Sequence, residues 1–175
     1  MLFLKSLDYE EEYFDVQTET TQHWKLKDLK FYQFTIIAGM NSVGKTRTCN
    51  VIRNTLMKIV APMKALQIGN TELTLNVSEN KLYKIIIDIE EDADRKKIIK
   101  KEELYERENG KLFPNIETML FNRETIFDSQ SKTHIPYSPP DDSLTFHVRR
   151  DKVSHPYLEE IISEMRKFYF LNFEE

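Results

Sequence analysis

The residues whose types and spacing best fit a chemical role lie between Gly39 and Thr46, in the segment GMNSVGKT. The segment has a glycine, then four other residues, and then glycine, lysine and threonine, which is the spacing of a phosphate-binding loop. Glycines allow successive backbone N–H groups to point at phosphate oxygens. The positive end of a helix that follows such a loop faces the same anion. The segment therefore predicts a binding site for the phosphates of a nucleotide.

Two side chains of this loop have distinct expected roles. Lys45 would place a compact cation on the β- and γ-phosphates, and it is the candidate catalytic residue. The Thr46 hydroxyl would bind a Mg²⁺ ion, which makes Thr46 the candidate metal ligand. Arg47 follows in the first helical turn, where it either is solvated or approaches a phosphate or a partner. The candidate nucleotide-binding residues of this segment are Gly39, Asn41, Ser42, Val43, Gly44, Lys45, Thr46, Arg47 and Thr48.

The elements on either side of the loop agree with the motif. Residues 34–38, FTIIA, form a continuous apolar run, which predicts a strand buried on both faces. After the loop, Ile52, Leu56 and Ile59 recur at helical spacing, and Pro62 is expected to end that helix. A strand before the motif and an amphipathic helix after it are the context that the motif requires.

The rest of the chain predicts mainly strands in one domain, residues 1–175. Its expected parts are 1–62 with the loop and helix, 63–127 rich in strands, and 128–175 with a loop and helix. The expected strands are 2–7, 24–31 with a bend near Asp28, 73–77 and 83–89, while 97–105 is a strand or a short helix. A hairpin or loop is expected at 9–22 and a loop at 128–143, and a helix is expected to begin at His155.

Composition narrows the possible classes of protein. The chain has 175 residues and a formal net charge of -4, so its overall charge does not indicate nucleic-acid binding. DNA stays a possible partner because Arg149 and Arg150 form a small basic cluster. The single cysteine, Cys49, excludes an internal disulfide and favours a reducing compartment. Since no apolar run is long enough to span a bilayer, we expect a cytoplasmic protein without membrane contact.

The loop GMNSVGKT, with Asn41 at its third position, resembles the ATP-binding heads of RecF/SMC/ABC-type ATPases. The nearest subgroup resembles the AAA-domain "overcoming lysogenization defect"-like (OLD-like) ATPases of bacteria. The first strand LFLKSL, the middle stretch KKIIKKEELYERENGKLF and the later stretch SHPYLEEIISEMRKF agree with that resemblance. It implies an α/β fold with a mixed sheet, an antiparallel β-subdomain and a few helices. The implied ligands are ATP and Mg²⁺.

The resemblance also implies further residues and partners. Thr48 would reach the α-phosphate, and Gln130 is the candidate for the glutamine that connects Mg²⁺ and the attacking water to a second lobe. The signature motif, the Asp-Glu strand end and the switch histidine of a full head have no counterpart here. The segment 8–14 is acidic, where many members carry an Asn-Phe-Arg-like stretch. The chain therefore resembles a first lobe, which would bind ATP and hydrolyse it only with a homodimer or partner chain that supplies the second lobe.

Three alternatives stay open at this point. Asp88 ends the apolar run IIID and could bind Mg²⁺ through water, but a solvated strand-end acid is preferred because Ile89 follows it. A small P-loop kinase or GTPase is a second enzyme class, although the stretch from Asn80 to Tyr83 lacks the Asp of a guanine-reading motif. A head without catalysis would serve as a scaffold. DNA repair and phage defence are the processes that the family resemblance suggests.

Overall fold

The computed structural model describes residues 3–15, 17–32, 35–37, 44–61, 68–78, 81–108 and 117–166. These residues form eight strands and three helices. The strands are β1 Phe3–Asp15, β2 Thr20–Lys30, β3 Gly69–Ser78, β4 Lys81–Glu91, β5 Lys97–Glu108, β6 Thr118–Phe121, β7 Thr125–Asp128 and β8 Thr133–Pro136. The helices are α1 Lys45–Val60, α2 Thr145–Val148 and α3 Pro156–Met165.

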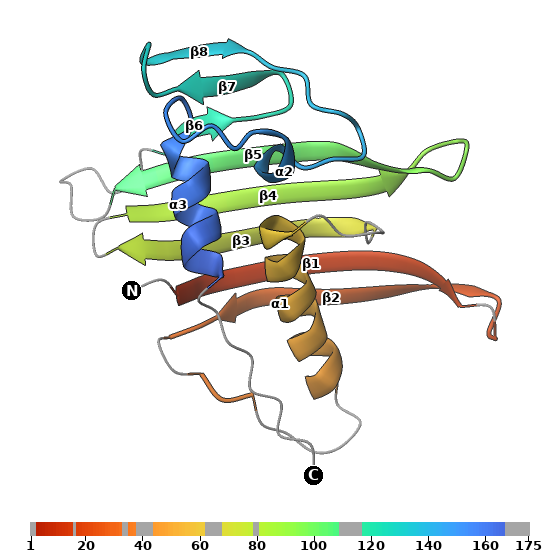
Figure 1. Ribbon diagram of the computed structural model, residues 1–175. Coiled ribbons are helices and arrows are strands. Elements are labelled where there is room, and N and C mark those ends of the chain that lie inside the picture. Colours follow the sequence, from red (N-terminus) through yellow and green to blue (C-terminus); the bar gives the residue numbers. More distant parts are fainter. Residues whose placement is uncertain are drawn as a thin grey trace.

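All eight strands belong to one sheet, with the order β2-β1-β3-β4-β5-β6-β7-β8 (Figure 1). Every pairing among these strands is antiparallel. The prediction of an α/β fold with a mixed sheet is therefore wrong. Short connections explain the difference, because residues 79–80 and 92–96 are long enough for hairpins but too short for the crossover that parallel strands need.

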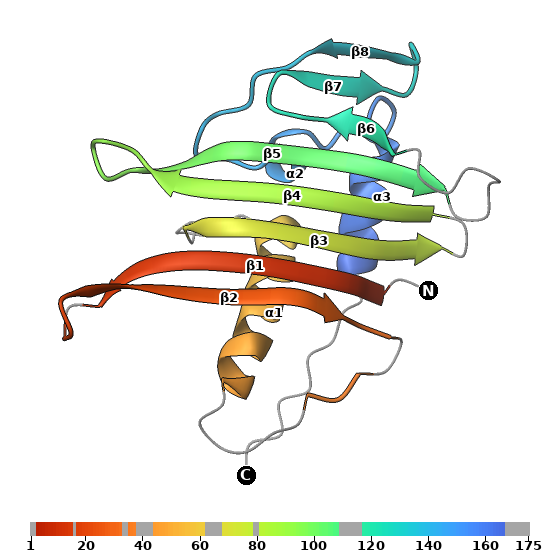
Figure 2. The same cartoon turned by 180° about the vertical axis from the view of Figure 1, so that it is seen from behind.

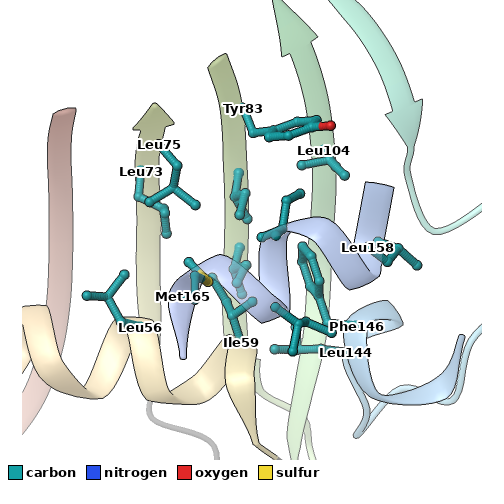
Figure 3. Packing of buried hydrophobic residues seen from close by; sticks show 14 of the residues in the cluster. Leu56, Ile59, Leu73, Leu75, Tyr83, Leu104, Leu144, Phe146, Leu158 and Met165 are labelled. Carbon is teal, nitrogen blue, oxygen red and sulfur yellow. The ribbon is translucent and has the colours of Figure 1, made fainter. Parts of the chain in front are cut away.

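One face of the sheet carries the hydrophobic core. In β3, Leu73 and Leu75 are fully buried, while the intervening Thr74 is half-buried on the other face. Helices α1 and α3 cover the first face, as Figure 1 shows, and Figure 2 shows the opposite face without helices. Ile59 of α1 packs with the sheet residues and with Met165 of α3 (Figure 3). Alternation with a period of two is what such a one-sided sheet requires.

The first hairpin is longer than its sequence suggests. The expectation of a hairpin or loop at 9–22 is confirmed as a hairpin, although its strands reach further than expected, since β1 continues to Asp15 and β2 begins at Thr20. Glu10 and Glu12 are tolerated there because they are exposed and alternate with the buried residues Tyr9 and Glu11, so one face of the strand still points to the core side. The predicted bend near Asp28 is confirmed, since Asp28 has a φ of 53°. The pairing also shifts register between Leu7 and Tyr9 on the neighbouring strand.

The strand expected at 34–38, before the glycine loop, is also wrong for those of its residues that the structure describes. Residues 35–37 are not in a strand, and Ile36 is 74% exposed. A strand buried on both faces needs covered parallel neighbours, and no described strand supplies a parallel edge. Residues 34 and 38 lie outside the described residues.

Other expectations have mixed outcomes. Helices are confirmed after Lys45 and after His155, and 97–105 is part of a strand. The expected loop at 128–143 contains β8, which pairs with β7 to form a short hairpin. Pro62 lies outside the described residues. Among the described helices, none is both long and apolar enough to cross a membrane.

A buried carboxylate connects β5 to the segment that leads into α2. Glu102 is fully buried, and both of its oxygens accept hydrogen bonds from the Thr145 N–H at 2.9 and 3.0 Å. The Thr145 hydroxyl donates a third bond at 2.8 Å, and the Arg123 guanidinium lies 3.8 Å away. Burial raises the pKa of Glu102 to about 7, while the bonds from Thr145 and the charge of Arg123 oppose that rise.

This raised pKa predicts a pH dependence of stability. The folded protein holds the Glu102 proton more tightly than the unfolded chain, so its contribution is complete below about pH 4.5 and is lost as the pH rises through 7. Between pH 5 and 8 we expect the wild type to lose roughly 2–3 kcal/mol of unfolding free energy relative to Glu102→Gln. Urea unfolding at several pH values measures the difference, and parallel curves for the two proteins would contradict it.

A second prediction concerns Gly69 at the start of β3. Its φ is 140°, and a Cβ there would lie 2.5 Å from the backbone oxygen of Glu10. Gly69→Ala should therefore lower the unfolding free energy by about 2 kcal/mol or more, since β1 and β3 must separate. Urea unfolding measures this loss. Thr74→Ala, in the same strand but on the face without helices, is the control and should change stability far less.

Candidate functional site at the start of helix α1

Helix α1 begins where the glycine motif places a helix start. Gly44 is the residue before the helix and has φ 87° and ψ 12°, in the left-handed region that favours glycine. The Thr48 N–H donates to the Gly44 carbonyl oxygen at 2.9 Å, which closes the first helical turn. The second glycine of the motif is therefore required by the backbone. Gly39, Asn41, Ser42 and Val43 lie outside the described residues.

The residues after Gly44 give this helix end a positive character. Lys45 is half-buried and Thr46 is exposed, both in the first turn, and Thr48 and Cys49 are half-buried. Within the described part of the chain, no side chain caps the first turn of α1, and that turn contains no acidic residue. Backbone N–H groups at a helix start carry partial positive charge, so Lys45 adds to a field that attracts anions.

Arg47, also in the first turn, is held by the β1–β2 hairpin. Its guanidinium forms an ion pair with Glu11 and donates to the Tyr13 hydroxyl at 3.4 Å. It also lies over two aromatic rings, with its central carbon 4.5 Å from the Trp24 ring centroid and 5.0 Å from that of Tyr13. These contacts join α1 to the outermost pair of strands. We call Glu11, Tyr13 and Trp24, together with Tyr9, the hairpin clamp.

The strand geometry explains why the hairpin clamp forms. Tyr9, Glu11 and Tyr13 alternate along β1, so they share the face that α1 covers. Trp24 lies directly opposite Glu11 in the β1–β2 register. The Tyr9 hydroxyl donates to Glu11 at 2.7 Å, and its ring contacts Trp24 edge to face with centroids 5.9 Å apart. Glu11 thus accepts from both β1 and α1.

Burial, hydrogen bonds and nearby charges shift the pKa values of Arg47 and Tyr9. Burial opposes the positive charge of Arg47, but its bonds to Glu11 and Tyr13 outweigh that effect and raise the pKa of the guanidinium. Burial, together with the bond to Glu11, raises the pKa of Tyr9 above its usual value, so Tyr9 stays a hydrogen-bond donor. The Glu11 side chain is 11% exposed, which makes loss of its cation costly.

Gln130 lies away from this region. It is an exposed residue of the β7–β8 turn, where its backbone N–H donates to Asp128 at 2.9 Å. Strands β7 and β8 form the edge of the sheet opposite to β2 and β1, as Figure 1 shows. The structure therefore brings Lys45, Thr46, Arg47 and Thr48 together at α1 but does not bring Gln130 to them.

Asp88 does not join the candidate site either. It lies within β4 rather than at its end, on the face opposite to its buried neighbours Ile87 and Ile89 and so opposite to α1. Partial burial and the nearby charge of Glu90 raise the pKa of Asp88. Among the described residues, no group of three or more His, Cys, Asp or Glu side chains could hold a metal ion.

Sequence reasoning did not identify the hairpin clamp. The sequence predicts a hairpin or loop for its acidic segment, and the order Tyr9, Glu11, Tyr13 has the period of a strand. An aromatic and acidic alternation opposite Trp24 is a signal that could have located a partner for Arg47.

Comparisons of the chain with protein-family models, curated proteins and solved structures gave no match. The role of the α1 start must therefore be inferred from its own residues and from the glycine motif.

The left-handed conformation of Gly44 predicts the effect of a substitution. Gly44→Ala should lower the unfolding free energy by about 1–2 kcal/mol, because a Cβ is disfavoured at this φ. A clash with the described residues should add nothing, since apart from its chain neighbours none of their atoms lies within 4 Å of the Cβ position. Urea unfolding measures the loss. Gly44→Asn is the matched variant and should lose less, because Asn tolerates this conformation better. Equal stability of all three proteins would contradict the prediction.

Proposed function

We propose that this chain binds Mg-ATP through the loop of residues 39–46 and the first turn of α1. The observation that carries the proposal is the helix start at Gly44, where the motif's second glycine is left-handed and is followed at once by Lys45 and Thr46. This placement supports a phosphate site because backbone N–H groups, the helix end and a lysine then face one region.

The charges around α1 also favour an anion as the ligand. No acid of the first turn competes with it, within the part of the chain that the structure describes. Glu11, the acid contributed by β1, is already paired with Arg47. These residues fit a nucleotide triphosphate, which would bring its own Mg²⁺ ion.

Each residue has a defined task in this proposal. Lys45 would hold the β- and γ-phosphates, and Thr46, whose side chain is exposed, would contribute its hydroxyl to the metal ion. Bound Mg²⁺ supplies charge neutralisation at the phosphates. Thr48 would lie near the α-phosphate, as the resemblance to RecF/SMC/ABC-type heads implies.

Hydrolysis is a separate matter from binding. The resemblance places the signature motif, the Asp-Glu strand end and the switch histidine in a second lobe, and we propose that a second copy or a partner chain supplies it. ATP would then be enclosed between two surfaces, so binding would promote association. Work in DNA repair or phage defence is the corresponding process-level proposal, and it rests on the sequence resemblance alone.

The test is calorimetric titration of the purified chain with Mg-ATP. Lys45→Ala should weaken binding by about tenfold or more, because a charge-assisted contact to phosphate is lost. Lys152→Ala, which removes an exposed lysine in the turn before α3, is the matched control and should bind as the wild type does. Thr46→Val should reduce the gain in affinity that Mg²⁺ gives.

Two results would contradict the proposal. Absence of Mg-ATP binding by the wild type would leave a non-catalytic scaffold as the better account. Equal affinities of wild type and Lys45→Ala would mean that ATP binds elsewhere on the chain. Titration with Mg-GTP distinguishes a nucleotide site in general from one that prefers adenine.

A further inference from the structure

We infer that Arg47 is a positioning residue: through Glu11, Tyr13 and Trp24, the β1–β2 hairpin fixes the first turn of α1 and so sets the affinity of that turn for phosphate. The statement about affinity rests on the proposed function. The statement about the first turn does not, because it concerns contacts within the protein itself. Arg47 was a candidate nucleotide ligand by sequence, so its role differs from that expectation.

The contacts of Arg47 favour positioning over phosphate binding. The guanidinium has an ionic partner, Glu11, and lies against the faces of two aromatic rings. A guanidinium group that stacks on aromatic rings and also bonds a carboxylate is held in one geometry, since both its flat face and its N–H donors are engaged. Moving Arg47 to a phosphate would break its ion pair with Glu11, whose side chain is 11% exposed.

The helix itself needs a negative charge at this place. A cation in the first turn is unfavourable beside the positive end of a helix, and α1 has Lys45 and Arg47 there but no acid. Glu11 of β1 provides the missing carboxylate from outside the helix. The ion pair therefore both orients α1 and offsets the charge of its first turn.

The two roles give opposite expectations for Glu11→Gln. If Arg47 positions the helix, loss of the carboxylate loosens the first turn and weakens phosphate binding. If Arg47 binds phosphate, loss of the competing carboxylate releases the guanidinium and strengthens binding. Glu12→Gln is the matched control, because it removes the same charge from the next residue of β1, which is exposed and pairs with His23.

The first measurement is amide hydrogen exchange without nucleotide. In Glu11→Gln and Arg47→Gln we expect the Thr48 amide and those of the following turn to exchange about tenfold faster, because the local opening of α1 becomes easier. Amides of α3 should be unchanged, which separates a local effect from a general loss of stability. Glu12→Gln should match the wild type. Unchanged exchange at Thr48 in both variants would overturn the inference, whatever the protein binds.

The second measurement is Mg-ATP affinity for the same variants and for the double variant. Positioning predicts that each single substitution weakens binding by about tenfold and that the double variant is little worse, since both remove one ion pair. Tighter binding by Glu11→Gln would overturn the inference in favour of a phosphate ligand. If the wild type does not bind Mg-ATP while exchange at Thr48 responds as expected, the proposed function fails and the positioning role within α1 stands.

Discussion

The covering of one sheet face by α1 and α3 is the constraint on which the rest of this molecule depends. A single antiparallel sheet can bury only one side when its helices all lie there, so every long strand must alternate between core and solvent. Ile59 of α1 and Met165 of α3 meet over the middle strands. Because α1 is held in that position by its apolar side, its first turn projects over β1 and β2.

That geometry turns a sheet edge into part of the candidate site. The face of β1 that points at α1 would ordinarily be apolar, but beyond Tyr9 it carries Glu11 and Tyr13. These polar and aromatic side chains match the polar start of α1, whereas Leu4 and Leu7 match the core. The change from apolar to polar along one strand therefore follows the change along the helix from its packed middle to its charged beginning.

Local patterns predicted the elements but not their assembly. Helical spacing located α1 and α3, and alternation located β3 and β4, since these periods reflect the contacts that each element makes. The predicted direction of strand pairing was wrong because the apolar run at 34–38 favours a strand in the core of a mixed sheet, although Ile36 is exposed. The position and spacing of the glycine motif predicted that a helix begins directly after Gly44. The partner of Arg47 depended on the β1–β2 register, which the turn and the alternation along both strands set together.

Strand β1 lies between β2, its neighbour in sequence, and β3, which follows only after α1. The β1–β2 hairpin and the run from β3 to β5 can each form from nearby residues. Pairing of β1 with β3 must instead close a long chain segment, and the entropy of that closure is lost before the new contacts compensate for it. The segment that closes is the one that carries the glycine motif. The rate at which this domain folds therefore depends on the length and stiffness of the segment between β2 and β3, and substitutions there can slow folding even where they leave the finished sheet unchanged.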